Sequence, residues 1–253
     1  MELSADILLL LFFIATIAGF IDTLAGGGGL ITIPALALSG IPILAVLGTN
    51  KLQGCSGTAT ASFLLYRRKK FQFEEIKQAF IMAFIGALIG SLAVQVINKD
   101  VLKFIVPVVL FGIGFYFLLS PYIKLSNDKL QLSNTTFNTT VIPGIGFYDG
   151  MFGPGTGSFF SLANLSLRNK KLIEATTLAK PLNFATNIAS LIIFIALGQV
   201  FWLAGAAMIC GQILGATAGS HFLYKINPGL LRAIVVIMCF GMLGNYLYRE
   251  ILL

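Results

Sequence analysis

Two glycine-rich breaks, each a few residues after an aspartate, constrain this chain more than any other feature of its sequence. Asp22 precedes the four glycines Gly26–Gly29, and Asp149 precedes Gly153–Gly157, which reads Gly-Pro-Gly-Thr-Gly. Neither run can continue an α-helix, because glycine destabilises a helix interior and proline removes a backbone donor. In lipid, such a break persists only where it is buried in protein or lines a cavity. Matching breaks in two halves of a chain therefore predict a binding site.

The breaks interrupt a chain of 253 residues that consists mainly of apolar segments. Hydrophobic residues make up 57% of it and charged residues 11%, whereas about a quarter of the residues of a soluble domain are charged. Several segments can cross about 30 Å of hydrocarbon, and none alternates with a period of two. We expect an all-α polytopic membrane protein with about ten helical segments. They lie near residues 7–25, 30–49, 52–66, 76–97, 101–120, 138–152, 158–167, 173–197, 200–224 and 230–248.

The scarce charged, cysteine and histidine residues exclude several classes of function. The net charge of +7 is placed at segment ends, which is typical of orientation signals and not of a nucleic-acid surface. Cys55, Cys210 and Cys239 have no paired spacing, and His221 is the only histidine, so we expect no metal site and no catalytic triad. The glycine runs lack the lysine and hydroxyl residue of a P-loop. We therefore expect neither an enzyme nor a cofactor.

The two halves of the chain match at a nearly constant spacing. Asp149 follows Asp22 by 127 residues, and Lys180 follows Lys51 by 129. The second spacing also relates Gly86 to Gly215, Gly90 to Gly219 and Phe111 to Phe240. We predict a tandem duplication with a first repeat over residues 1–120, a polar loop over 121–137 and a second repeat over 138–253.

The basic residues change sides between these repeats. The cluster Arg67–Lys70 has an uncharged counterpart at 196–199, whereas Arg168–Lys171 is basic where 39–42 is uncharged. Because basic loops face the cytoplasm, the second repeat should be inserted with the opposite topology, as in transporters built from inverted repeats. Each repeat then has about five segments, and its first two fold back at the glycine break.

Four stretches of this sequence resemble a known family. Gly19–Pro34 and Leu47–Leu52 are similar to the first half of the sulfite exporter TauE/SafE family, and Gly146–Gly157 and Ala179–Asn187 to its second half. The resemblance covers essentially the whole chain, although Pro181 departs from the family's small or β-branched residue. It implies a multi-pass transporter in the inner membrane of a bacterium or archaeon. The cargo would be a small sulfur-containing anion such as sulfite, thiosulfate or an organosulfonate.

Lys51 and Lys180 are the sharpest candidates for substrate binding. Each lies within an apolar segment, where an unpaired lysine costs about 3 kcal/mol or more, and both repeats keep one at the equivalent place. We expect two ammonium groups that converge on an oxyanion. The alternative is that each lysine pairs with an aspartate or extends to the membrane surface.

Asp22 and Asp149 have two interpretations as well. Each can cap the restarting helix by accepting backbone N–H bonds. Alternatively, one of them pairs with a lysine or titrates as a coupling group. Coupling to protons or to sodium stays open.

The remaining candidate ligands are the backbone of the breaks and polar side chains beside the lysines. Helix N-termini with free N–H groups attract anions, and asparagine amides can either bind an oxyanion or bridge helices. The predicted substrate-binding residues are Gly26, Gly27, Gly28, Gly29, Asn50, Lys51, Gly153, Gly155, Thr156, Gly157, Lys180 and Asn183.

These observations together predict a secondary transporter of a small sulfur-containing anion. It would work by alternating access, with its site at the membrane midplane between the repeats. An anion channel with the same positive helix ends, and a cation carrier that uses Asp22 and Asp149, are the alternatives. The expected partners are the small anion and the lipid bilayer, and the oligomeric state stays open.

Overall fold

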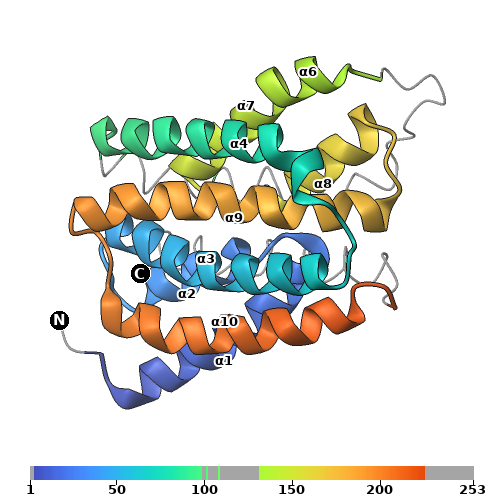
Figure 1. Cartoon of the computed structure of the whole chain (residues 1–253). Helices are drawn as coiled ribbons and strands as arrows, with labels where there is room; N and C mark the ends of the chain where they lie inside the picture. The colour runs from blue at the N-terminus through green and yellow to red at the C-terminus, as the bar shows by residue number, and fades with distance from the viewer. Residues whose placement is uncertain (1–2, 99–100, 102–107, 109–130, 226–253) are drawn as a thin grey trace.

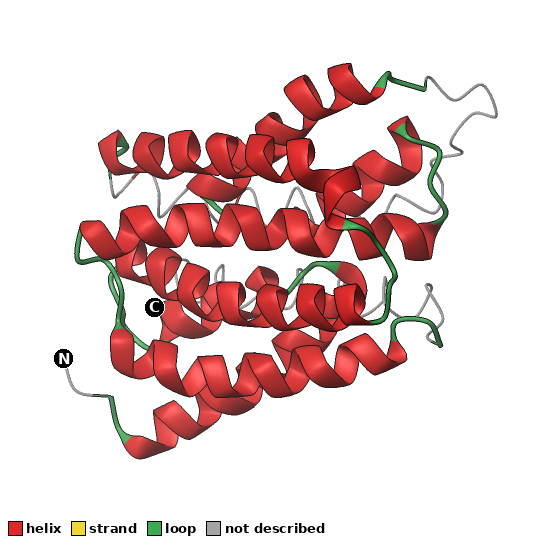
Figure 2. Cartoon of the chain, viewed as in Figure 1, coloured by secondary structure: helices red, strands yellow, loops and turns green. Residues whose placement is uncertain are grey.

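The computed structural model describes residues 3–98, 101, 108 and 131–225, and the elements of these ranges are all helical (Figures 1 and 2). The first half contains α1 (Ala5–Ala25), α2 (Gly29–Leu38), α3 (Ile43–Arg67), α4 (Phe73–Ala93) and the short 3-10 turn η1 (Val94–Val96). The second contains α6 (Asn134–Thr136), the π-helical turn η2 (Phe137–Val141), α7 (Ile142–Met151), α8 (Thr156–Leu167), α9 (Leu172–Ala196) and α10 (Trp202–Phe222).

Four of these helices are long and apolar enough to cross a membrane: α1, α4 with η1, α9 and α10. α3 has the same 25-residue length as α9 but carries more polar residues, among them Asn50, Lys51 and Gln53. The expected helical membrane protein is confirmed. The expected segments at 101–120 and 230–248 lie largely or wholly outside the described residues, so the number of ten stays a prediction.

Both glycine runs end a helix, as the sequence predicts. α1 ends at Ala25 because Gly26 takes the left-handed conformation, with φ 85°, and α2 restarts at Gly29. α7 ends at Met151, and Gly153 and Gly155, with φ 92° and 76°, turn the chain into α8. A residue with a Cβ rarely adopts these backbone angles, which explains why glycine occupies these positions.

Helices of the two halves pack against each other in layers. α1 of the first half packs on α10 of the second, and α7 of the second packs on α4 of the first. α3 and α9 lie side by side between these pairs and run in opposite directions (Figure 1). The bounds of α3 and α9 differ by 129 residues at both ends, and so do those of α4 and α10. The spacing seen in the sequence is therefore also a spacing of the helices.

Glycines allow the outer helix pairs to approach very closely. A Cβ on Gly90 of α4 would lie 2.0 Å from the Phe147 carbonyl oxygen of α7, and one on Gly215 of α10 would lie 2.1 Å from the Thr16 oxygen of α1. Small residues are expected at such helix contacts in membranes, where close van der Waals packing drives association. The two contacts fix α1 to α10 and α4 to α7.

Replacing one of these glycines should loosen a helix pair. We expect Gly90→Ala and Gly215→Ala each to lower the stability of the purified protein by about 1–3 kcal/mol, because the added methyl group overlaps a carbonyl oxygen. The matched control is Gly144→Ala in α7, since a Cβ there has no neighbour within 4 Å. Thermal unfolding in detergent measures the difference. Equal melting temperatures for Gly90→Ala and Gly144→Ala would contradict the packing argument.

Candidate functional site

The aspartate before each break binds the chain that follows it. The Asp22 carbonyl oxygen accepts the Gly26 N–H at 2.7 Å, and its Oδ1 accepts the Gly28 N–H at 2.9 Å. In the second half, Asp149 Oδ1 accepts the hydroxyl of Thr156 at 2.7 Å. Each aspartate thus stabilises a turn that glycine or proline alone would leave loosely ordered.

The two breaks meet backbone to backbone. A Cβ on Gly26 would lie 2.3 Å from the Gly157 carbonyl carbon and the Ser158 nitrogen, so no larger residue fits there. The Ser158 N–H donates to the Gly26 carbonyl oxygen at 3.4 Å, and the Ser158 hydroxyl donates to the Ala25 carbonyl oxygen. Segments 132 residues apart in the chain therefore form one centre.

Each buried lysine reaches the break of the opposite half. Lys51 of α3 donates to the Asp149 carbonyl oxygen and forms an ion pair with Asp149 Oδ1 at 2.8 Å. Lys180 of α9 donates to the Asp22 carbonyl oxygen. The two lysines are only 1% and 0% exposed. Each ammonium group therefore links a long helix of one half to the break of the other half.

The two lysine contacts are not equivalent. Lys51 contacts both the carbonyl and the carboxylate of its aspartate, whereas Lys180 has no carboxylate oxygen within 4.0 Å among the described residues. Asp149 is 1% exposed, while Asp22 is only partly buried. The two corresponding aspartates therefore form one closed ion pair and one carboxylate with an open side.

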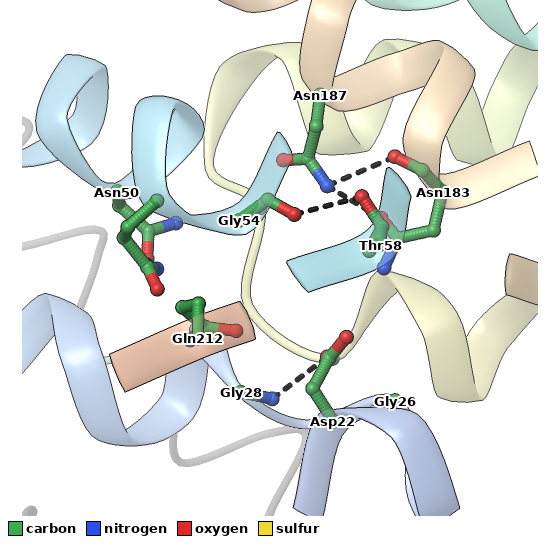
Figure 3. Close-up of a pocket in the computed structure, with 13 residues that line it drawn as sticks. Asp22, Gly26, Gly28, Asn50, Gly54, Thr58, Asn183, Asn187 and Gln212 are labelled. Carbon is green, nitrogen blue, oxygen red and sulfur yellow. Dashed lines mark hydrogen bonds between the residues drawn. The ribbon is translucent and has the colours of Figure 1, made fainter. Parts of the chain in front are cut away.

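A polar pocket lies at the junction of the breaks with α3, α9 and α10 (Figure 3). Carboxamide and hydroxyl side chains and glycine backbone surround the open side of Asp22. The pocket is small, since its empty space of about 340 Å³ includes the solvent at its open mouth. The lining residues are Asp22, Gly26, Gly28, Gly29, Asn50, Gln53, Gly54, Thr58, Gly153, Gly155, Asn183, Asn187 and Gln212.

Two asparagines present N–H donors at this site, because neighbouring groups occupy their oxygens. Asn50 Oδ1 accepts from the Thr32 hydroxyl at 2.6 Å and from Gln53 Nε2 at 2.7 Å. Asn183 Oδ1 accepts from Asn187 Nδ2 at 3.2 Å. Neither asparagine's Nδ2 donates to a described residue. The arrangement leaves hydrogen-bond donors available for an acceptor ligand.

These amide nitrogens lie beside the restarting helices. Asn50 Nδ2 is 3.6 Å from the Cβ position of Gly29 in α2, and Asn183 Nδ2 is 3.3 Å from that of Gly157 in α8. The N–H groups of Gly29 and Gly157 donate to no carbonyl in the described part of the chain. Each helix start therefore combines an amide side chain with a free backbone donor, and the helix dipole favours negative charge there.

The structure brings most of the predicted site residues to this pocket and keeps some behind it. Lys51, Asp149, Thr156, Gly157, Gly27 and Lys180 are outside the lining, although Lys51 Nζ is 3.0 Å from the Cβ position of the lining residue Gly153. Five lining residues are absent from the predicted set: Gln53, Gly54, Thr58, Asn187 and Gln212. The available signal was a polar residue inside a membrane helix, since such residues usually face a cavity or a functional site.

Comparison with known proteins gives a consistent result over the whole chain. The family model described as "Sulfite exporter TauE/SafE" matches residues 11–246. A "Probable membrane transporter protein" of Haemophilus influenzae is 41% identical over 99% of this chain and 98% of its own length. The "Probable membrane transporter protein YfcA" of Escherichia coli K12 is 43% identical over 94% of this chain and 88% of its own. No solved structure matches the chain.

The closed ion pair gives a stability test. Lys51→Met leaves the buried Asp149 carboxylate without its cation, and we expect a loss of about 3–5 kcal/mol. The double variant Lys51→Met/Asp149→Asn should recover much of that loss, because it removes the uncompensated charge. Thermal unfolding in detergent compares the two.

Lys180→Met is the matched comparison for this test. Because Lys180 donates only to a carbonyl oxygen and Asp22 faces the pocket, we expect a smaller loss than for Lys51→Met. A double variant as unstable as Lys51→Met alone would show that the ion pair does not carry the stability.

Proposed function

The chain belongs to the sulfite exporter TauE/SafE family of membrane transporters, and we propose that it is a secondary transporter of a small sulfur-containing anion. Sulfite, thiosulfate and organosulfonates form the proposed substrate class, and the proposed location is the inner membrane of a bacterium or archaeon. The anion binds at the membrane midplane, where the two glycine breaks meet, and crosses by alternating access.

The observation that carries the proposal is the set of unused donors around the pocket. The amide nitrogens of Asn50 and Asn183 and the N–H group of Gly29 have no acceptor in the described protein. A sulfonate or sulfite group offers three oxygens on a small tetrahedral or pyramidal centre, so several donors can bind it at once. Neutral donors at helix starts bind oxyanions without the strong attraction that would hinder release.

The two buried lysines supply the positive charge of the proposed site. Lys51 lies directly behind Gly153, and Lys180 lies behind the turn that starts at Asp22. In this low-dielectric setting, a positive charge acts over longer distances than it does in water. We propose that both lysines attract the anion and keep the two breaks in register while it binds.

We further propose that the two halves are inverted repeats of about five segments each. The opposite directions of the equivalent helices α3 and α9 support this (Figure 1). The C-terminal end of α3, with Arg67–Lys70, and the start of α9, after Arg168–Lys171, lie towards the same side of the molecule (Figure 1). That side would face the cytoplasm by the positive-inside rule.

Binding of a panel of anions to the purified protein tests the proposal. We expect saturable binding of sulfite, thiosulfate or methanesulfonate. Asn183→Leu should weaken it about 10–100-fold, the usual loss for a hydrogen bond to a charged group. Asn138→Leu is the matched control, since that amide pairs with Gln78 and does not line the pocket.

Transport in liposomes then separates a carrier from a channel. Saturable uptake that is accelerated by unlabelled substrate on the opposite side supports the carrier. Conductance far above carrier turnover would support the channel. Failure of the whole panel to bind would contradict the proposed substrate class.

A further inference from the structure

The duplicated aspartates Asp22 and Asp149 have different surroundings. Asp149 is closed off, since its Oδ1 accepts from the Lys51 ammonium at 2.8 Å and from the Thr156 hydroxyl at 2.7 Å. Asp22 lines the pocket, and its Oδ1 accepts the Gly28 N–H. The second oxygen of Asp149 also has no hydrogen-bond partner among the described residues, but it is buried away from the pocket. In Figure 3 the second carboxylate oxygen of Asp22 points into the pocket. A carboxylate thus faces the space where the proposed anion binds.

Few other charges face Asp22 from the elements around it. Lys180 of α9 donates to the Asp22 carbonyl oxygen, and Lys51 of α3 pairs with Asp149 of α7. The helices α2 and α8 carry no charged residue, and α10 carries only His221, which is exposed at its far end. Two lysines and two aspartates therefore determine the charge of this centre.

The protonation state of Asp22 sets the net charge of this group of four. With Asp22 ionised, the two positive and two negative side chains cancel. With Asp22 protonated, the Lys51–Asp149 pair remains neutral, and Lys180 leaves one net positive charge. Only the second state offers a monovalent anion a compensating charge and removes the repelling carboxylate.

We propose that Asp22 takes up one proton with each anion, so that the two cross the membrane together; this rests on the proposed function and names its coupling. The proton enters the carboxyl group from the side to which the pocket is open and leaves with the anion on the other side. Asp149 does not take part, because the Lys51 ammonium and the Thr156 hydroxyl close it off from the pocket.

The cost of buried charge explains why the two movements are linked. The empty centre with Asp22 ionised is neutral, and so is the centre that holds a proton and a monovalent anion. The anion alone or the proton alone leaves one uncompensated charge away from water, which is strongly unfavourable. The neutral states can therefore switch between facing one side of the membrane and facing the other, whereas the charged states cannot do so readily.

The number of protons taken up per anion is measured by calorimetric titration of the full-length wild-type protein with methanesulfonate. Methanesulfonate keeps its single negative charge between about pH 5 and 9, because sulfonic acids are strong acids. The titration is repeated in buffers of different ionisation enthalpy, and the change in binding heat between buffers gives the number of protons taken up. We expect about one proton per anion, and an affinity that falls about tenfold per pH unit once Asp22 is ionised in the empty protein.

Two variants assign the proton to its residue. Asp22→Asn keeps an oxygen for the Gly28 N–H and should bind methanesulfonate without proton uptake and with a flat pH profile. The double variant Lys51→Met/Asp149→Asn removes the closed ion pair without changing the net charge, so it should still take up one proton for each anion it binds. The reverse pattern, with proton uptake kept in Asp22→Asn and lost in the double variant, would overturn the assignment.

The wild-type titration distinguishes a failure of the proposed coupling from a failure of the proposed function. Saturable binding with no proton uptake and no pH dependence would overturn the coupling and leave the anion transporter standing. If neither methanesulfonate nor thiosulfate binds at any pH, both the proposed function and the coupling fail.

Discussion

The structure depends on two buried lysines that cross from one half of the chain to the helix break of the other. Lys51 binds the Asp149 turn, and Lys180 binds the Asp22 turn. A lysine that is fully buried in a membrane protein needs such partners, and the exposed carbonyl oxygens of a helix break provide them. The breaks in turn need the lysines, since a turn without regular hydrogen bonds would leave polar backbone unsatisfied. Each half therefore supplies the polar partners that the other half needs.

This mutual dependence explains why the glycines gather at one point. Gly26 and Gly157 let the two turns touch through their backbones, so that the helix starts of α2 and α8 lie at the same pocket. A side chain at either glycine would push the turns apart and separate Lys51 and Lys180 from their acceptors. The glycine runs and the lysines are thus parts of one arrangement.

The sequence predicts the features that occur in both halves of the chain. It does not predict the site residues that occur in only one half. The helix breaks follow from glycine and proline, and the equivalent positions of Lys51 and Lys180 follow from the constant spacing. The pocket also uses Gln53 and Gln212, which have leucine and alanine at the matching places of the other half. Comparing the repeats does not highlight such residues. Likewise, no sequence pattern distinguishes Asp22 from Asp149, because their difference arises from the distance to a lysine on another helix.

The kinds of contact indicate where the proposed movement can occur. The α1–α10 and α4–α7 pairs touch through glycine and carbonyl groups at contact distance, and such interlocked surfaces resist sliding. Between these pairs, α3 and α9 meet around polar side chains whose hydrogen bonds can be exchanged for bonds to a ligand or to water. A motion that keeps the outer pairs intact and shifts α3 against α9 would open the pocket first to one side and then to the other. Lys51 of α3 contacts α7, and Lys180 of α9 contacts α1, so both lysines cross this same boundary. The charge of the centre and the movement of the two groups of helices are therefore governed by the same contacts.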